Sequence, residues 1–257
     1  MLKKILWCLL VLHVTLFGND TALQRVFETH QVDGAMLIES LDGKERYVYN
    51  EERAQRQLSP ASTFKIPNTL IALQEGVIDT QTLILWDGVE RSIPSWNQDQ
   101  TLSLAFKRSC VWCYQKFARS IGLEKYRSYL HTLDYGNTKT GNDVERFWLD
   151  GELRISAYEQ VAFLKKVYTN ALPFAKTHLD TLKTIMVEER KTVYTLRAKT
   201  GWAVPNNAEH HGWYVGYVES QKGVYFFATN LITPSSEVLP LRKIISLEAL
   251  RAKGILE

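Results

Sequence analysis

The chain has 257 residues, of which 45% are hydrophobic and 11% aromatic, and 31 basic residues stand against 28 acidic ones. This length and apolar content suit one large domain, or two closely packed lobes, with a sizeable core, and they exclude a disordered chain. A charge so close to balance gives no electrostatic reason to expect binding to nucleic acid or to a membrane surface.

The first segment is typical of a secretory signal. Two lysines precede an apolar run over residues 5–17, which is short for a membrane span. We therefore expect residues 1–18 to be a signal peptide and residues 19–257 to be one mature domain with no stable membrane association. Bulky Leu16 leaves the cleavage point open, and an uncleaved anchor is the alternative.

A β-hairpin and a helix are the first regular elements predicted after this segment. Apolar, β-branched and aromatic residues predict strands over 34–40 and 45–50, joined by a turn at 41–44. A helix is predicted next over 61–74, and Gly76 ends it.

Ser62 and Lys65 lie near the start of that helix, three residues apart and hence on one face. Free N–H groups and the positive end of the helix dipole favour a developing negative charge there. Lys65 has apolar neighbours, and burial disfavours its ammonium form, so it can remove the serine proton. We interpret the pair as an activated serine that needs no histidine. A surface serine beside a solvated lysine is the alternative, and this motif alone does not decide between them.

The middle of the chain is predicted to be mostly helical, and the end returns to strands. Amphipathic patterns predict helices over 112–121, 124–133, 157–170 (capped by Ser156) and 180–187. Strands are predicted over 192–199, 212–219 and 223–232, followed by a helix over 241–253. This order predicts an α+β fold in which both chain ends build one antiparallel sheet around an inserted helical lobe. The site would lie between sheet and lobe.

Two closely spaced cysteines and two adjacent histidines are the candidates for redox or metal chemistry. Cys110 and Cys113 could form a disulfide, but a regular helix gives this spacing poor geometry, so we expect two buried thiols. No second pair of ligands completes a zinc site, so no metal is expected. His210 and His211 would point apart on a strand, and we interpret them as part of a polar turn.

Three further motifs follow Ser62 and Lys65 in order: Ser109-Cys110-Val111, Tyr135-Gly136-Asn137 and Lys199-Thr200-Gly201. Each motif alone could occur by chance. All of them in this order, each on the element predicted for it, are not a chance match. With Phe147-Trp148-Leu149 and residues 239–243, they make the chain resemble the class D serine β-lactamases, which belong to the serine penicillin-recognising enzymes. Val111 replaces the asparagine of class A enzymes and transpeptidases.

The resemblance implies an α/β/α sandwich of the β-lactamase/transpeptidase type. It implies hydrolysis of the β-lactam ring of penicillins through an acyl-serine on Ser62, and hence antibiotic resistance. In class D enzymes the lysine matching Lys65 carries CO2 as a carbamate, which is the base for acylation and deacylation. No metal or nucleotide is implied. The expected partner is a small-molecule β-lactam, the expected location is the periplasm, and the protein is a monomer or homodimer.

The resemblance also implies roles for residues near the lysine. Ser109 would pass a proton to the leaving lactam nitrogen. Val111 and Leu149 would keep water off the carbamate, to which the indole N–H of Trp148 would donate. Without the resemblance, core packing would be the preferred explanation of the last three, and a helix cap would explain Ser109 equally well.

The implied substrate-binding residues come from the end of the chain. Lys199-Thr200-Gly201 would bind substrate along a strand, with the lysine supplying positive charge and the glycine allowing close approach. Trp202 and Ser62 would supply the backbone N–H groups of the oxyanion hole, and Arg242 would bind the β-lactam carboxylate. We interpret Tyr135-Gly136-Asn137 as a structural turn that shapes the cleft wall.

Two alternatives share the serine–lysine pair. A β-lactam sensor domain would acylate and stay acylated, but such domains normally follow several membrane spans and lack the apolar wall of Val111. A penicillin-binding transpeptidase would carry asparagine at that position. The two cysteines and Trp112, which stands where many relatives have proline, surround Val111 and leave the substrate preference open.

Overall fold

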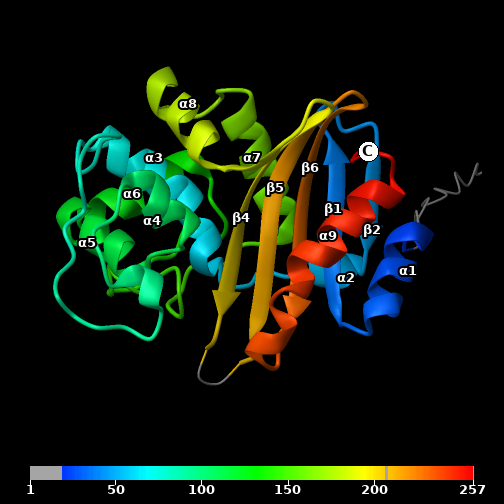
Figure 1. Ribbon diagram of the computed structural model, residues 1–257, viewed down its shortest axis with the longest axis horizontal. Coiled ribbons are helices and arrows are strands. Elements are labelled where there is room, and N and C mark those ends of the chain that lie inside the picture. Colours follow the sequence, from blue (N-terminus) through cyan, green and yellow to red (C-terminus); the bar gives the residue numbers. More distant parts are fainter. Residues whose placement is uncertain (1–18, 206–207, 257) are drawn as a thin grey trace, which may run out of the picture.

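The computed structural model describes residues 19–205 and 208–256 (Figure 1). The expected signal peptide, residues 1–18, lies outside the described residues. Within the described ranges, no helix combines the length and the apolar character that crossing a bilayer requires.

A six-stranded antiparallel sheet in the order β2-β1-β6-β5-β4-β3 forms the centre of the fold (Figure 1). The strands are β1 (Gly34–Ser40), β2 (Arg46–Tyr49), β3 (Val187–Arg190), β4 (Tyr194–Ala203), β5 (His211–Ser220) and β6 (Gly223–Ile232). Gly34 pairs with Leu231 and Ser40 with Tyr225, so a strand from the start of the chain lies beside one from its end. This confirms the predicted sheet and fold class.

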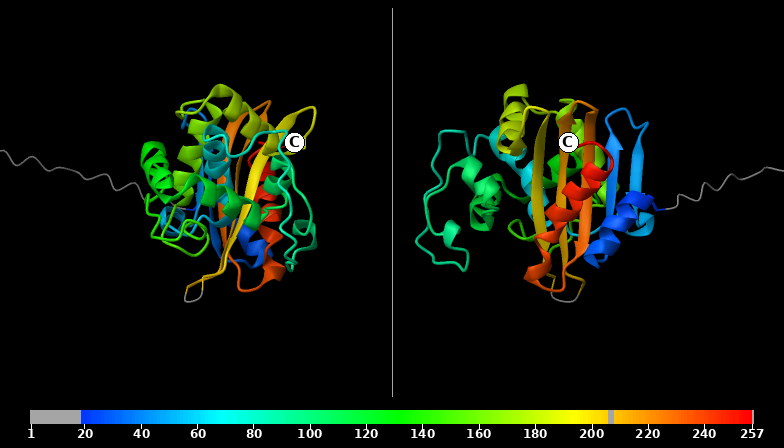
Figure 2. Two further views of the ribbon diagram at one scale, coloured as in Figure 1. Left: turned by 90° about the vertical axis from the view of Figure 1, so that its left-hand side faces the viewer. Right: turned by 45° about the vertical axis from the view of Figure 1, so that its right-hand side comes forward.

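Every residue of β1 is buried, because both faces of the sheet are covered. Met36 and Ile38 face a cluster beneath α1 (Thr21–His30) and α9 (Leu241–Ala252), and Ala35 and Leu37 face the cluster of the helical lobe. Figure 2 shows α1 and α9 together on one face of the sheet. α7 (Ala157–Tyr168) packs against β1, β5 and β6 on the opposite face.

The lobe contains most of the remaining helices. The helices not yet given are α2 (Glu51–Gln55), α3 (Lys65–Gln74), α4 (Leu102–Lys107), α5 (Val111–Ile121), α6 (Leu123–Leu133) and α8 (Lys176–Ile185), with the 3-10 helices η1 (Ala61–Phe64), η2 (Pro94–Trp96) and η3 (Ser236–Val238). Of these, α2 packs against β1 and β2, and η3 connects β6 to α9, so both lie outside the lobe. Helix α1, helix α2 and strand β3 were not predicted. The predicted helix over 180–187 begins earlier and ends at Ile185, because Val187 pairs with Arg197 of β4.

Local sequence signals account for the ends of several helices. Ser156 was expected to cap α7, and its hydroxyl accepts from the Glu159 N–H at 3.2 Å while the Glu159 carboxylate accepts from the Ser156 N–H at 2.7 Å. This capping box is reciprocal and satisfies two free donors of the first turn. The Asp20 carboxylate caps α1 in the same manner, accepting from Ala22 and Leu23 at 3.1 Å.

Candidate active site

Ser62 and Lys65 come together where a 3-10 turn becomes a helix. Ser62 lies in η1, and Lys65 is the first residue of α3. The lysine Nζ donates to Ser62 Oγ at 3.1 Å. The spacing of three residues, which placed both side chains on one face of a helix, therefore also brings them into contact in this tighter turn.

Lys65 is almost completely buried, whereas Ser62 is partly exposed. Its Nζ lies 4.9 Å from the centre of the Tyr114 ring. Among the described residues no charged group contributes to the pKa shift of Lys65, for which burial is the sole cause. Burial lowers the pKa of Lys65 to about 7, because the low-dielectric surroundings disfavour the ammonium form. Near neutral pH, a large fraction of this amine is therefore uncharged and able to accept a proton.

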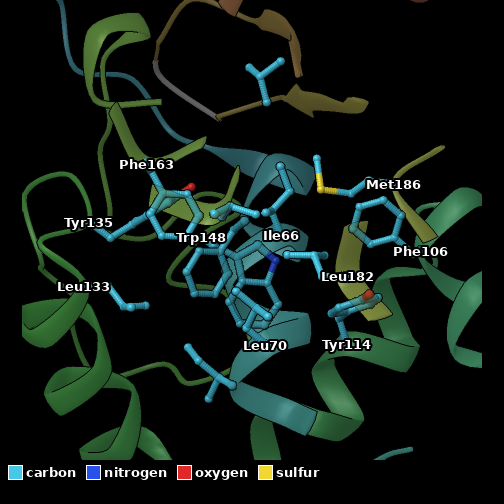
Figure 3. Packing of buried hydrophobic residues seen from close by; sticks show 14 of the residues in the cluster. Ile66, Leu70, Phe106, Tyr114, Leu133, Tyr135, Trp148, Phe163, Leu182 and Met186 are labelled. Atoms are coloured by element: carbon cyan, nitrogen blue, oxygen red, sulfur yellow. The ribbon is translucent and has the colours of Figure 1, made fainter. Parts of the chain in front are cut away.

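Trp148 is buried in the same region and stacks on Phe64, the residue before Lys65, with ring centres 5.6 Å apart. It belongs with Ile66 and Leu70 to the buried cluster drawn in Figure 3. Its indole Nε1–H is buried without a hydrogen-bond partner among the described residues. An unpartnered donor and a buried amine without a carboxylate fit a carboxylated lysine, whose oxygens would accept from the indole.

Val111 and Leu149 are partly buried, unlike Trp148. Val111 is the first residue of α5, and Leu149 packs on the edge of the core cluster. Both retain some exposure, as side chains at the wall of a cleft would.

Ser109 and Lys199 are brought into contact from the lobe and the sheet. Lys199, on β4, donates through Nζ to Ser109 Oγ and to the Thr200 carbonyl at 3.0 Å. Burial lowers the pKa of Lys199 well below its usual range, and the nearby charge of Lys65 lowers it further. Lys199 and Thr200 also line a hollow together with Phe106.

Cys110 and Cys113 form a disulfide, with their Cα atoms 5.5 Å apart. The prediction of two free thiols was wrong, because it assumed that both residues lie within a regular helix. Cys110 is instead the N-cap of α5, with φ −53° and ψ 106°, so its side chain reaches the first turn of the helix from outside. The prediction that both sulfurs are buried is confirmed.

Gly201 lets β4 pass close to the turn that carries Ser62. A Cβ at Gly201 would lie 2.9 Å from the Pro60 carbonyl oxygen and 3.1 Å from Thr63 Cγ2, which only glycine avoids. The next residue, Trp202, is 40% exposed. The sheet therefore meets the turn that carries Ser62 by backbone contact.

Arg242, in the first turn of α9, lies beside the same part of β4. Its Nη1 donates to the Gly201 carbonyl at 2.9 Å, and its Nε is buried without a partner in the described ranges. Burial lowers the pKa of Arg242 to about 10, so the guanidinium is still charged at neutral pH. A charged group with an unused donor fits an anionic ligand.

Tyr135, Gly136 and Asn137 form a packed turn. Tyr135 lies edge-on to Phe64, with ring centres 5.7 Å apart. Gly136 has φ +55°, and a Cβ there would lie 2.0 Å from the Arg154 carbonyl oxygen. The Asn137 side chain accepts from the Arg154 N–H at 3.0 Å. These contacts give each residue a structural role.

Sequence reasoning missed a group of residues that contact the segment before Ser62. His211, expected in a polar turn, is instead the buried first residue of β5, and its Nε2 lies 2.9 Å from the Ser59 carbonyl oxygen. Trp213 Nε1 donates to the same oxygen at 2.9 Å. That expectation was wrong because strand pairing with Ala203 and Ile232 draws His211 into the sheet. No local pattern signals a contact between residues 152 positions apart.

Comparison with known proteins gives concordant matches. The family model described as penicillin binding protein transpeptidase domain matches residues 29–248. Beta-lactamase OXA-20 of Pseudomonas aeruginosa is 45% identical over 214 residues, covering 82% of this chain and 79% of that protein. Beta-lactamase OXA-48 of Klebsiella pneumoniae is 41% identical over 231 residues, covering 90% of this chain and 87% of that protein.

Solved structures of class D β-lactamases have the same fold as this chain. The class D β-lactamase FUS-1 (OXA-85) from Fusobacterium nucleatum subsp. polymorphum superimposes with a TM-score of 0.90 at 35% identity, covering 93% of this chain and 100% of that one. The class D β-lactamase YbXI from Nostoc gives a TM-score of 0.88 at 40% identity, covering 91% and 99%.

Proposed function

Because the chain belongs to the class D serine β-lactamases, enzymes that hydrolyse β-lactams, we propose that it opens the ring of penicillins through a covalent acyl-serine on Ser62. The observation that carries this proposal is the contact of 3.1 Å between Ser62 Oγ and the buried Lys65 Nζ. A lysine with a pKa of about 7 can take the serine proton at the pH where the enzyme works.

In acylation, Ser62 Oγ forms a bond to the lactam carbonyl carbon as Lys65 accepts its proton. The backbone N–H groups of Ser62 and Trp202 would stabilise the oxyanion. The lactam C–N bond then breaks, and the nitrogen takes a proton from Ser109, which contacts Lys199. Ser109 is reprotonated by the proton that the base at Lys65 took from Ser62, so that the base is free again for deacylation. Arg242 would bind the substrate carboxylate while Thr200 and Gly201 hold the substrate along β4.

CO2 bound to Lys65 as a carbamate would supply a carboxylate base in place of the amine. The indole N–H of Trp148 would orient that base, and Val111 and Leu149 would exclude bulk water around it. In deacylation, a water molecule attacks the acyl carbonyl carbon, its proton goes to the base at Lys65, and the bond to Ser62 Oγ breaks as the serine regains a proton.

We further propose that residues 1–18 direct export to the periplasm and that residues 19–257 form the catalytic domain, as a monomer or homodimer. The substrate is a small molecule, and a nucleic acid partner is not part of the proposal. No group of three or more metal-binding side chains occurs among the residues that the structure describes.

Ampicillin hydrolysis by the purified protein, with and without bicarbonate, tests the proposal. Many turnovers, faster with bicarbonate, are expected, because a carboxylated Lys65 serves both half-reactions. One stoichiometric acylation that then stops would instead identify a β-lactam sensor, in which Lys65 serves acylation only. Turnover that bicarbonate does not change would reject the carbamate.

A further inference from the structure

We propose that His211 is a positioning residue for the nucleophile, which holds the turn before Ser62 through the carbonyl oxygen of Ser59. The proposal rests on Ser62 being the acylated serine. His211 does not touch the proposed reacting atoms, so its effect would pass through the backbone between Ser59 and Ser62.

The turn needs support from outside, because its backbone conformation is unfavourable. Ala61, directly before Ser62, has φ +48°, a left-handed conformation in which the Cβ of an L-residue crowds the following carbonyl oxygen. Such residues persist where surrounding contacts hold them in place. On the C-terminal side, the N–H and hydroxyl of Thr63 both donate to the Pro60 carbonyl, at 3.1 and 2.7 Å.

On the N-terminal side, Ser59 is the point of attachment. Its buried carbonyl oxygen accepts from His211 Nε2 and from Trp213 Nε1, both at 2.9 Å. Its hydroxyl lies 2.7 Å from the carbonyl oxygen of Leu149 and 3.1 Å from that of Trp148. Ser59 therefore joins strand β5 to the segment that carries the Trp148 indole, and it anchors both to the turn of Ser62.

His211 differs from Trp213 in that its hydrogen bond to the Ser59 carbonyl depends on the protonation state of the ring. Both of its ring nitrogens face backbone carbonyl oxygens, since Nδ1 lies 3.2 Å from the Glu209 carbonyl. A carbonyl only accepts, and a neutral imidazole has one N–H to give. The neutral ring thus satisfies one carbonyl and leaves the other facing a lone pair, whereas the imidazolium satisfies both.

Two charged groups act on His211 from the elements packed around it. Arg53, on α2, lowers its pKa, and Glu209, in the segment before β5, raises it. These two form an ion pair at 2.6 Å, so their effects partly cancel. Burial is the largest influence and lowers the pKa of His211 below its ordinary value, while the two carbonyl contacts oppose it. At neutral pH the ring is neutral, and its one N–H is directed either to the Ser59 carbonyl or to the Glu209 carbonyl, depending on the tautomer. Below the pKa of His211 both nitrogens carry a proton, so the hydrogen bond to Ser59 is present in every molecule.

Single-turnover acylation by a penicillin tests the proposal with two variants. His211→Leu fills a similar volume without a donor, and we expect acylation to slow by about 10- to 100-fold, because a nucleophile displaced by a fraction of an ångström loses its alignment. His211→Gln restores an N–H toward Ser59 and should recover most of the rate. The exposed His131, on α6, offers a matched control, since His131→Leu should acylate at the wild-type rate.

The pH dependence of acylation is a second test, because a residue that acted by packing alone would not change it. The acylation rate of the wild type divided by that of His211→Gln should rise as the pH falls through the pKa of His211, followed by NMR of its ring, because only histidine gains a second N–H on acidification. This ratio is measured on two folded proteins even if His211→Leu is unstable.

Unchanged acylation in His211→Leu, equal slowing in both His211 variants, or a ratio that stays flat across the titration of His211 would each overturn the proposal. Intact-mass measurement of the acyl adduct in Ser62→Ala distinguishes failure of the His211 proposal from failure of the proposed function. An adduct that persists there would refute Ser62 as nucleophile, whatever the His211 variants show.

Discussion

In the proposed mechanism, Lys65 sets the pH range in which Ser62 reacts. Burial lowers its pKa from 10.5 to about 7, so the amine is increasingly protonated as the pH falls below that value. A protonated amine can neither take the serine proton nor combine with CO2.

The acylation rate should therefore fall by about tenfold per pH unit below about pH 6 and level off above about pH 8. Stopped-flow acylation at one fixed bicarbonate concentration below saturation measures this. A rate that is constant down to about pH 5 would show that the proton acceptor is not at Lys65.

Trp148 offers a test of the unpartnered indole N–H. Trp148→Ala should slow deacylation more than acylation and raise the bicarbonate concentration needed for full activity, because the base at Lys65 loses its donor. Trp148→Phe keeps an aromatic ring against Phe64 and removes only the N–H, so it should show the same bicarbonate dependence with a smaller loss of stability. Equal turnover without added bicarbonate in wild type and Trp148→Phe would contradict the role of the indole.

At the scale of elements, the disulfide fixes the start of α5 next to Ser109 and Val111. It closes a short loop, and the loop-closure relation assigns such a cross-link about 2 kcal/mol of stability. The double variant Cys110→Ser/Cys113→Ser should lose about that much free energy of unfolding in urea, relative to the oxidised wild type. Wild type that is unfolded and refolded under reducing conditions is the matched control and should behave like the variant. An unchanged unfolding midpoint would show that the bond adds nothing.

Patterns within a few residues predicted the elements well. The spacing of Ser62 and Lys65, the cap at Ser156 and the glycine that ends α5 each act over one or two turns, so the sequence alone reveals them. The boundary between α8 and β3 was missed because the decisive interaction, pairing with β4, comes from another part of the chain.

Contacts across the site could not be predicted from local patterns either, because they join residues that are far apart in the sequence. Ser109 and Lys199 are 90 positions apart, and the resemblance to a known family, rather than spacing, brought them into one site. His211 had no such guide and was misplaced. The disulfide was misjudged because the backbone angles of a capping residue are set by the chain that leads into the helix.

At the scale of the whole molecule, the buried Lys65 lowers stability. The unfolded chain holds the lysine proton up to its ordinary pKa of 10.5, while the folded protein releases it near 7, which corresponds to about 5 kcal/mol against folding below pH 7. Because the unfolded state binds more protons between these values, the folded state gains stability as the pH rises from about 7 to about 10.5.

Lys65→Met should therefore raise the free energy of unfolding by several kcal/mol at about pH 6, and the gain should shrink toward pH 10. Urea unfolding of both proteins in CO2-free buffer at pH 6, 8 and 10 measures the difference. A gain that is independent of pH would mean that it comes from packing instead of the charge.

The pairing of β1 with β6 also determines when the sheet can be completed during folding. Gly34 meets Leu231 only after nearly the whole chain has been made, and closing so long a loop is slow. The β1–β2 hairpin and the lobe helices can form during synthesis, but β4 and β5, which contact the turn that carries Ser62, come late. An emerging chain thus has no assembled site until its last strands have followed, which is compatible with the export proposed for it.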